Sequence, residues 1–465
     1  MRRMAFRGFA AGFFLLAVSA RMCGQKPSAA AQTKSLTLEQ AVTMALQSNP
    51  ALHASQDEAD AAKARVGQAR AAWFPRLDAS QGFTRGNNPV YVFGTLLTQR
   101  NFTAANFALA GLNTPAPLDN FQTRLDAQMT LFDSGKTYLQ EKGARKLATA
   151  ADYQTEQARQ DLILRVAQSY YGVIVAREDL QAAQEALHAA EANEQSVHSL
   201  QQAGQVVSSD LLSAQVFRAQ MSDREIRAED TLEVAQLTLG RELGLPPGAM
   251  PEPTATLGEP VAGSRSLEEW QRTGLAQRPL LRAAELGGEA AATNRKLAKA
   301  AFGPQVGLFA NLERDAETLG GPSGTNWTAG AQVNINLFAG GAARYRLAET
   351  VARERQAKDE LSWLRSGVEL QVRQSYLETA AAAQRAAAAR DAVGEAQDSL
   401  RIIQNRYQAG LVTITELLRA QTAQLEARTS YLAALHDWQV ARAQLEHAAG
   451  ELTARSKLIR EGEAQ

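Results

Sequence analysis

The chain has 465 residues, and its 49 basic and 49 acidic residues leave no net charge, so the composition does not indicate a nucleic-acid surface. Aromatic residues make up only 6% of the chain, which favours long, closely packed helices over a thick globular core. A single cysteine, Cys23, excludes an intrachain disulfide.

The first residues have the pattern of an export signal. Basic residues in the first seven positions precede an apolar run over 9–18, and small residues follow it. We expect 1–20 to be a signal peptide, followed by an N-terminal segment over 21–35. Cys23 is a candidate for lipidation, although Ala-Arg-Met at 20–22 fits lipoprotein processing poorly, and the alternative is that this cysteine has no role. No later run has the roughly 20 apolar residues of a transmembrane helix.

The rest of the chain contains an internal repeat, with two similar copies. Leu38 reappears as Leu267, a shift of 267 − 38 = 229, whereas Phe132 reappears as Phe338, a shift of 338 − 132 = 206. One insertion of 229 − 206 = 23 residues in the loop over about 84–120 explains the difference. A repeat of this length predicts two similar structural units.

Each copy is expected to open with one helix. The first begins at the capping box Thr37-x-x-Gln40 and ends before Pro75; the second begins at Ser266-x-x-Glu269 and ends before Pro304. Later in each copy, a long tract without proline predicts a continuous helix on the order of 100 Å long. Apolar residues at seven-residue spacing in these tracts indicate helices packed side by side.

Between these helices the period changes to two. Over 327–338, apolar residues alternate with polar ones, and three further segments show the same alternation, which is typical of strands with one apolar face. The first predicted repeat covers 36–243, with strands at about 76–85 and 121–132 and a long helix at about 136–202. A Pro/Gly-rich connector follows over 244–265. The second repeat covers 266–452, with strands at about 305–313 and 327–338 and a long helix at about 341–408, and a C-terminal tail covers 453–465.

These strands have the length and the dyad pattern of a membrane β-barrel wall. For any single strand the alternative is a soluble hairpin packed on a helix, but four such strands between long helices of an exported chain favour the barrel. Trp327 at one strand end and Phe132 and Phe338 at the other suit interfacial aromatic girdles. Four strands cannot close a barrel, and open edges are not tolerated in lipid. The chain is therefore expected to oligomerise, most economically as a cyclic trimer with twelve strands.

The chain resembles the TolC-like outer-membrane efflux proteins, the outer membrane factors, over about 36–452. The resemblance rests on the duplicated architecture, on the strand-to-helix junctions at 131–135 (Leu-Phe-Asp-Ser-Gly) and 337–341 (Leu-Phe-Ala-Gly-Gly), and on the Ala-Gly turns at 203–204 and 409–410. It implies a mainly α fold with a membrane β-barrel part. Each chain would supply a duplicated helix-strand-strand-helix-helix unit to a homotrimer, whose twelve-stranded barrel in the outer membrane continues into a long helical barrel in the periplasm.

The resemblance also implies a function without any cofactor. Members of the family are passive conduits of tripartite efflux or type I secretion systems. They are opened at the periplasmic tip by an adaptor (membrane fusion) protein and an inner-membrane pump of the RND or ABC type. The exported substrate, whether drug, metal or protein, is chosen by the pump and is not visible in this sequence.

The two Ala-Gly turns resemble the family's periplasmic tip, where the channel narrows and the adaptor binds. Carried over by position, Asp210 and Glu416 match acidic residues of the entrance constriction and Tyr407 keeps a tyrosine position. Arg419 occupies a position that is acidic in the family's best-known pattern, and Val412 occupies a position that is basic in that pattern. The interactions that lock the family's closed state are therefore in doubt for this chain. Glu416 has an alternative role as the second half of a capping box with Thr413. The expected adaptor contacts are Gly204, Leu211, Leu212, Gly410, Leu417 and Leu418.

Two other classes of function were weighed. A periplasmic coiled-coil adaptor or scaffold would share the helices but would not need four amphipathic strands. A periplasmic enzyme is disfavoured because the five histidines show no recognisable metal spacing and no phosphate-binding or dinucleotide motif is present. We therefore expect no catalytic, cofactor or metal residues. The insertion in the first loop either folds over the pore mouth or is a tolerated surface insertion.

Overall fold

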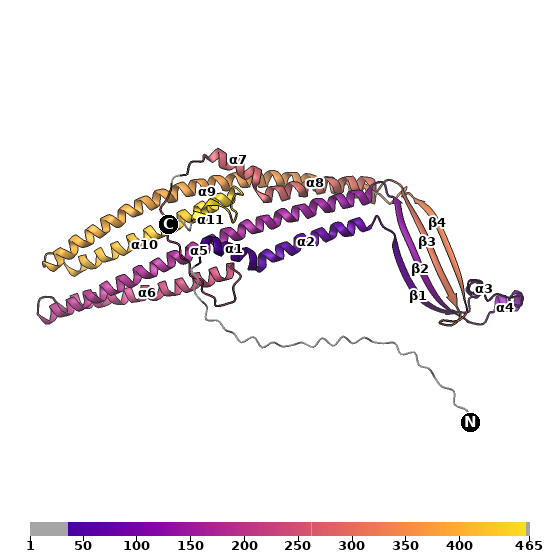
Figure 1. The fold of residues 1–465 in the computed structure, drawn as a ribbon, viewed down its shortest axis with the longest axis horizontal. Coiled ribbons are helices and arrows are strands. Elements are labelled where there is room, and N and C mark those ends of the chain that lie inside the picture. Colours follow the sequence, from indigo (N-terminus) through magenta and orange to yellow (C-terminus); the bar gives the residue numbers. More distant parts are fainter. Residues whose placement is uncertain (1–35, 262, 462–465) are drawn as a thin grey trace, which may run out of the picture. The chain divides into compact units, whose positions relative to one another are not determined.

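The fold is taken from a computed structural model, which describes residues 36–261 and 263–461. The predicted signal peptide, the segment 21–35 with Cys23 and the last four residues lie outside the described residues. The two repeats contain the same helices at the same spacings, as Figure 1 shows. In the first repeat these are α1 (Leu38–Ser48), α2 (Pro50–Ala71), α5 (Lys136–Gln202) and α6 (Ser208–Glu242); in the second they are α7 (Leu267–Gln277), α8 (Pro279–Ala300), α9 (Ala342–Gln408) and α10 (Ile414–Ala448).

The shifts found in the sequence relate these helices residue for residue. Adding 229 to the bounds of α1 and α2 gives those of α7 and α8, and adding 206 to the bounds of α5 and α6 gives those of α9 and α10. The two long helices have 67 residues each. The predicted continuous helices are thus present, and the second begins one residue later than expected.

The prediction of one opening helix per repeat is wrong, because each is divided into two helices at a proline. Asn49 precedes Pro50, and Arg278 precedes Pro279; both residues have extended backbone (ψ 119° and 118°). A residue before proline is disfavoured in the helical region, whereas proline itself suits the first position of a helix. The Asn49 side chain also accepts hydrogen bonds from the N–H groups of Ala51 and Leu52, so it caps the second helix.

The strands form one antiparallel sheet in the order β1-β2-β3-β4, with β1 and β4 at its edges. Their bounds are β1 Arg76–Gly86, β2 Leu118–Phe132, β3 Gln305–Ala316 and β4 Ser323–Asn334. The predicted strand over 327–338 is misplaced: β4 begins four residues earlier and ends at Asn334, which pairs with Gln305, the first residue of β3. Residues 335–338 extend beyond the position of Gln305, where β3 begins, so they have no neighbouring strand in a single chain. β2 and β3 are also longer than predicted, by three residues each.

The register collects the apolar strand residues on one face of the sheet, here called the apolar face. Leu125 of β2 is opposite Leu312 of β3, which is opposite Trp327 of β4. The same face carries Leu77, Ala79 and Phe83 of β1, Phe121, Ala127 and Met129 of β2, Val306, Leu308 and Ala310 of β3, and Ala329, Ala331 and Val333 of β4. Trp327 is 76% exposed and Val333 68%, so this face is uncovered in a single chain. The opposite face is mainly polar, with Arg124, Glu313 and Asn326 in one row.

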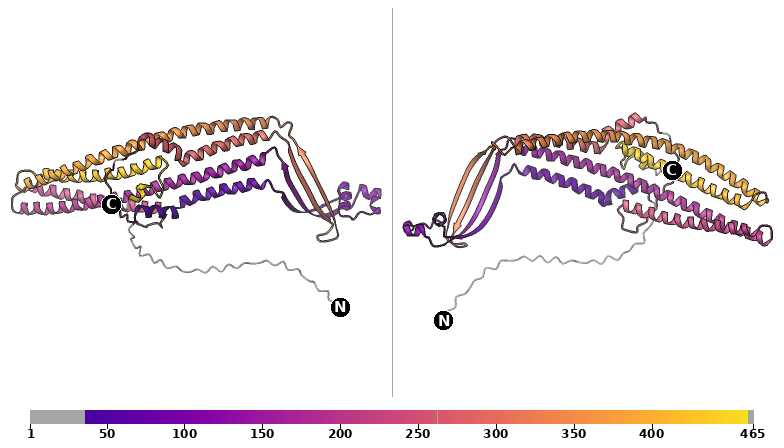
Figure 2. Two further views of the ribbon diagram at one scale, coloured as in Figure 1. Left: turned by 45° about the horizontal axis from the view of Figure 1, so that its top comes forward. Right: turned by 180° about the vertical axis from the view of Figure 1, so that it is seen from behind.

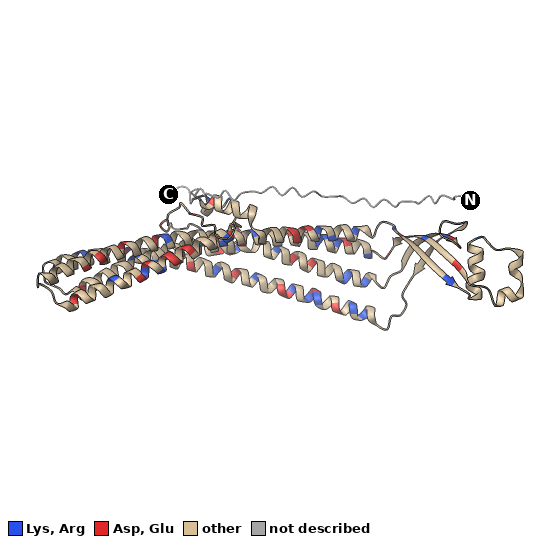
Figure 3. Ribbon diagram, turned by 90° about the horizontal axis from the view of Figure 1, so that it is seen from below, with Lys and Arg blue, Asp and Glu red and all other residues tan. Residues whose placement is uncertain are grey.

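Long helical hairpins extend away from the sheet. Figures 1 and 2 show the hairpins α5–α6 and α9–α10 side by side, with their turns at the end far from the strands, while α2 and α8 run between the middle of the bundle and the sheet. Charges of both signs are spread along the helices (Figure 3). Among the described residues, no helix combines the length and apolarity needed to cross a membrane.

The main core lies where the two repeats meet. It contains Tyr170, which is fully buried and donates a hydrogen bond to the carbonyl of Leu36 (2.9 Å). The second repeat contributes Ala443 from α10 and, beyond it, Leu452, Leu458 and Ile459; the last two lie on the short helix α11 (Lys457–Glu461). The C-terminal tail therefore ties the second repeat to the first.

A polar cluster that includes the buried His447 and Arg278 holds the same boundary. Nε2 of His447 on α10 lies 2.6 Å from Oδ1 of Asp161 on α5, and Gln157 donates to the same oxygen (2.7 Å). Arg278, which is 4% exposed, donates to the carbonyls of His447 and Ala448. Burial opposes ionisation of Asp161, but the hydrogen bonds from His447 and Gln157 and the positive charges nearby outweigh it and hold its pKa below the ordinary value.

Replacing Asp161 tests this cluster. A carboxylate with a lowered folded-state pKa stabilises the fold above its unfolded pKa of about 3.9, and this contribution is lost as the pH falls through the folded pKa. We expect Asp161→Asn to lower the free energy of unfolding by about 1 kcal/mol at neutral pH, and the difference from the unmodified chain to vanish in strong acid. Thermal unfolding followed by circular dichroism over this pH range measures both. The control is Asp57→Asn, at an exposed position of α2; a pH-independent difference would contradict the assignment.

The two faces of β4 offer a second test. A carboxylate on a lipid-exposed strand face is destabilising, whereas one on a water-facing side is tolerated. We expect Val333→Asp to reduce the oligomer recovered from the membrane several-fold and its neighbour Asn334→Asp to leave it unchanged. The measurement is the amount of oligomer on native gels of detergent extracts. Equal effects of the two substitutions would show that the faces are wrongly assigned.

Candidate functional site

The first candidate site is at the turns of the two long hairpins. Gly204 follows α5 and Gly410 follows α9, with φ of 72° and 70°, a left-handed backbone that glycine adopts without strain. The N–H groups that follow, of Gln205 and Leu411, each bond back to a carbonyl five residues earlier and so close the helix ends. The Ala-Gly turns therefore lie at the helix reversals.

The two turns pack against each other. Val197, Ala214 and Ile414 are buried together, and Leu211, Tyr407 and Leu418 are packed on them. Leu417 is also buried, at 3% exposure, so in a single chain it is a packing residue. By contrast Leu212 is 61% exposed, as a residue that contacts a partner must be.

Tyr407 and Asp210 come together across this contact. The Tyr407 hydroxyl is shielded from solvent and has no hydrogen-bond partner among the described residues. Burial raises the pKa of Tyr407, and the negative charge of Asp210 raises it further. Glu416 is exposed at the start of α10. Its N–H lies 3.4 Å from the Thr413 hydroxyl, but the return bond that completes the capping boxes of α1 and α7 is not formed between these two residues.

A groove of about 580 Å³ runs between α6 and α10 next to the turns. It brings together the predicted residues Leu212, Leu418 and Arg419, whereas Glu416 does not line it. Val216 and Phe217, which were not predicted from the sequence, also line this groove with Leu212. Leu212 and Val216 are four residues apart on one exposed face of α6, which is the signal that could have identified Val216.

The second candidate site is at the other end of the described chain, where the insertion of the first repeat folds back on the sheet. The insertion forms α3 (Pro89–Thr98), a 3₁₀ helix (Ala104–Phe107) and α4 (Leu109–Asn113). Gln99 is 1% exposed and donates to the carbonyl of Asp119 (2.8 Å) and to Asn120 Oδ1 (3.0 Å). Asn120 in turn donates to Asp315 Oδ1 (2.7 Å), so a chain of buried polar groups anchors the insertion.

These contacts place the end of α3 on the polar face of the sheet. Asp315 is opposite Gly324, and both belong to that face. The carbonyl of Thr98 accepts a hydrogen bond from Asn326 (3.1 Å), and a Cβ at Gly324 would come within 1.8 Å of the same oxygen. Sequence patterns could not reveal this docking, because the partners are more than 200 residues apart.

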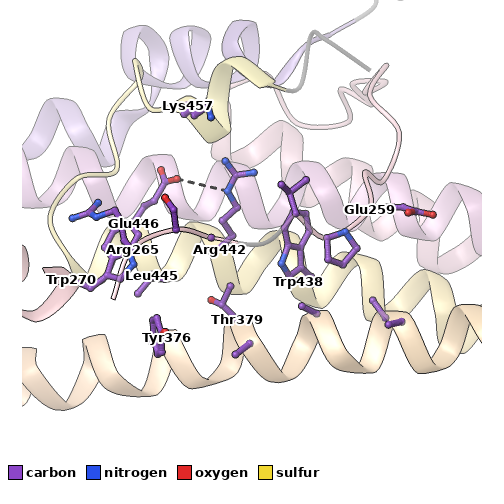
Figure 4. A pocket seen from close by; sticks show the side chains of 18 of the residues that line it. Glu259, Arg265, Trp270, Tyr376, Thr379, Trp438, Arg442, Leu445, Glu446 and Lys457 are labelled. Carbon is purple, nitrogen blue, oxygen red and sulfur yellow. Dashed lines mark ion pairs between the residues drawn. The ribbon is translucent and has the colours of Figure 1, made fainter. Parts of the chain in front are cut away.

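A further cavity, of about 790 Å³, lies between the connector, α9 and α10 (Figure 4). The Arg265 guanidinium lies 3.7 Å from the centre of the Trp270 ring and 2.6 Å from Glu451, and Arg442 pairs with Glu446 (3.9 Å). Its charged side chains are thus largely paired with one another. In the described part of the chain no group of His, Cys, Asp and Glu side chains could hold a metal ion.

Comparison with known proteins decides among the classes of function. The model of the family described as "Outer membrane efflux protein" matches residues 41–245 and 271–451, which are the two repeats. The chain belongs to this family. It is therefore an outer-membrane channel of the efflux and type I secretion class, a conduit and not an enzyme, with its β part in the outer membrane and its helical part in the periplasm.

Similar proteins support the same conclusion over almost the whole length. The chain is 26% identical to protein CyaE of Bordetella pertussis, over 92% of this chain and 86% of CyaE. It is 24% identical to the proteases secretion protein PrtF of Dickeya chrysanthemi, over 88% of this chain and 87% of PrtF. In fold it is similar to the outer membrane protein VceC of Vibrio cholerae, with a TM-score of 0.73 and 21% identity over 89% of this chain and 96% of VceC.

The anchoring of the insertion can be tested at Gln99. Loss of its buried amide leaves the carbonyl of Asp119 and the Asn120 side chain without a donor, which costs about 1–3 kcal/mol. We expect Gln99→Ala to speed hydrogen exchange of the α3 amides strongly, whereas Asn113→Ala, at the exposed end of α4, leaves it unchanged. Mass spectrometry of the purified protein measures the exchange. Unaltered exchange in Gln99→Ala would show that the polar chain does not hold the insertion.

Proposed function

We propose that the protein is a homotrimer whose three sheets close into one twelve-stranded barrel, which continues into a helical tunnel. The observation that carries the proposal is the four-stranded sheet with an exposed apolar face and two open edges. Unpaired backbone groups at such edges are not tolerated in lipid, so β4 of one copy has to pair with β1 of the next. Three copies supply twelve strands, which exceeds the eight strands of the smallest bacterial barrels and leaves an ample lumen; this is the smallest ring of copies that does so.

The helical turns are the proposed periplasmic gate. A trimer brings three copies each of Asp210, Tyr407 and Glu416 around the axis, and rings of carboxylates favour cations over anions. The packing of Leu211 and Tyr407 on Ile414 joins the two hairpins of a chain, so movement of one hairpin against the other opens the tip. Arg419, in the groove beside Leu418, takes the place of a further acidic residue and limits the negative charge of the entrance.

The proposed docking site for the periplasmic adaptor is the groove at the turns. Leu212 is exposed, and Val216 and Phe217 continue the apolar surface into the groove. Gly204, Gly410, Leu211 and Leu418 shape the turns that surround it. Leu417 supports this surface from inside through its buried side chain, which refines its expected role as an adaptor contact.

We also propose that the insertion narrows the outer mouth. Its contacts with Asp315, Gly324 and Asn326 lie on the polar face, which becomes the inner wall when the apolar face meets lipid. Three copies then restrict the barrel at its outer end. Of the two roles considered for this loop, these contacts favour the fold over the pore mouth.

The inner-membrane partner is proposed to be an ABC-type pump of a type I secretion system. The name of the relative PrtF assigns that protein to protease secretion. An RND-type pump of an efflux system is the alternative, supported by the description of the family model as efflux protein. In both cases the energy comes from the pump, and the channel itself is passive.

Planar-bilayer recording with parallel mass measurement tests this function. We expect the detergent-purified protein to have the mass of a trimer and to give small, cation-selective currents. Glu416→Gln removes the charge at nearly unchanged size, so it should weaken the cation preference, whereas Glu39→Gln in α1 serves as the control. A folded protein that stays monomeric and does not conduct would contradict the channel. An unchanged reversal potential in Glu416→Gln would show that Glu416 does not contribute to the selectivity.

A further inference from the structure

The helix ends next to the sheet carry an excess of positive charge. The four segments that join helices to strands, 62–75, 133–146, 291–304 and 335–348, together hold 12 basic and 2 acidic residues, a net charge of 12 − 2 = +10. The rest of the chain holds 49 − 12 = 37 basic and 49 − 2 = 47 acidic residues. Figure 3 shows the excess as blue segments at the helix ends beside the sheet. A chain without net charge thus concentrates positive charge in one narrow zone.

The other end of the sheet has no such excess. Residues 84–120 and 313–323, which contain the outer strand ends and their loops, hold 3 basic and 4 acidic residues. Both ends of the sheet lie at a surface of the outer membrane, because the β part of the chain is in that membrane and the helices are in the periplasm. The positive charge is therefore specific to the periplasmic surface.

Half of these basic side chains are neutralised within the chain. Six of the twelve form an ion pair with a carboxylate, for example Arg145 with Glu141 (2.5 Å). The other six form no ion pair within the described residues; five of them are exposed, and Lys136 is half-buried. These six, here called the basic collar, are Lys136, Lys142, Lys296, Lys299, Arg344 and Arg346. Their charge is not balanced by the chain itself.

The length of the strands places the basic collar at the depth of lipid headgroups. β3 and β4 have 12 residues each. Twelve residues of a strand tilted by about 40° rise about 30 Å, which is the thickness of the hydrocarbon core, and each headgroup layer adds about 5–7 Å. Lys142, the collar residue furthest from a helix end, lies about 9 Å into α5. Long basic side chains can extend over the remaining distance.

Exposed aromatic side chains lie in the same zone. Tyr138 near the start of α5 is 55% exposed, and Tyr345 near the start of α9 is 74% exposed. Tyrosine is enriched where a membrane meets water. The ammonium group of Lys142 lies 5.8 Å from the centre of the Tyr138 ring, so a collar residue and an interfacial aromatic residue share one side of α5.

We propose that the basic collar binds the phosphate groups of anionic phospholipids in the periplasmic leaflet of the outer membrane. An ammonium or guanidinium group forms charge-assisted hydrogen bonds with a phosphate. The attraction falls off within a Debye length, so side chains at headgroup depth contribute most. The contact sets the depth of the strands in the membrane. It requires the β part to lie in the outer membrane but does not depend on the number of copies in the channel.

Lipid retention tests the basic collar. The detergent-purified protein is incubated with equal amounts of phosphatidylglycerol and phosphatidylethanolamine, and mass spectrometry counts the lipids that stay bound after free lipid is removed. We expect the unmodified protein to retain about fivefold more phosphatidylglycerol. A collar variant should lose this preference; it combines Lys136→Gln, Lys142→Gln, Lys296→Gln, Lys299→Gln, Arg344→Gln and Arg346→Gln.

A control variant loses the same charge at exposed positions far from the sheet. It combines Arg241→Gln, Arg272→Gln, Arg373→Gln, Arg406→Gln, Arg455→Gln and Arg460→Gln. We expect it to keep the preference for phosphatidylglycerol. Equal losses in the two variants would show an effect of net charge alone and overturn the proposal. A collar variant that keeps the preference would also overturn it, and if its reversal potential in planar bilayers changes, the charges belong to the pore.

The unmodified protein gives a reading that needs no variant to assemble. Raising the salt from about 0.1 M to about 1 M shortens the Debye length from about 10 Å to about 3 Å, so we expect the preference to fall towards equal retention. A preference that salt does not change would show that charge does not select the lipid. Inorganic phosphate at low millimolar concentration should leave the bound lipid in place; displacement by phosphate would indicate a site for a free anion and overturn the lipid assignment.

Discussion

Backbone N–H and C=O groups have no water to bond with inside a membrane, so each of them needs a partner within the protein. The chain supplies four strands, which satisfy one another except along the outer edges of β1 and β4. The register also exposes one continuous apolar face, including Leu312 and Trp327. The unpaired edges are costly for an isolated copy in lipid, and they are satisfied when copies join edge to edge. The apolar face is costly in water and suits a lipid environment. The proposed oligomer, with its closed barrel and pore, follows from this requirement.

The helices extend the duplicated design into the periplasm without a thick core. Each long helix packs against the returning helix of its own hairpin and against a shorter helix from the start of a repeat. The cores of the two repeats differ because the tail after α10 packs on only one of them. The tail after α10 packs Leu458 and Ile459 on the first repeat, so the main core is complete there. The corresponding core around Val372 of α9 is smaller and lies beside an open cavity.

The two ends of the structure are built by different means. At the turns, Gly204 and Gly410 reverse the helices, and an apolar contact around Ile414 joins the two hairpins. At the outer end, Gln99, Asn120 and Asp315 attach the insertion to the sheet by buried hydrogen bonds. An apolar contact lacks directional bonds and lets packed hairpins slide, which suits the gate proposed at the turns. A directional polar chain fixes the insertion in place.

Elements with a local sequence pattern could be predicted from the sequence. The absence of proline, together with apolar residues at helical spacing, predicted α5 over its full length and α9 to within one residue. Alternation of apolar and polar residues predicted four strands and their apolar face. A local signal was also overlooked, since Pro50 and Pro279 divide the opening helices. The remaining features depend on partners far apart in the chain. The end of β4 at Asn334 is set by where β3 begins; the cluster of Asp161, His447 and Arg278 and the docking of Gln99 on the sheet need the folded contacts. These features follow from the tertiary structure, because a hydrogen bond or a strand pair forms between neighbours in space. Periodicity along the chain does not specify which distant residues become neighbours.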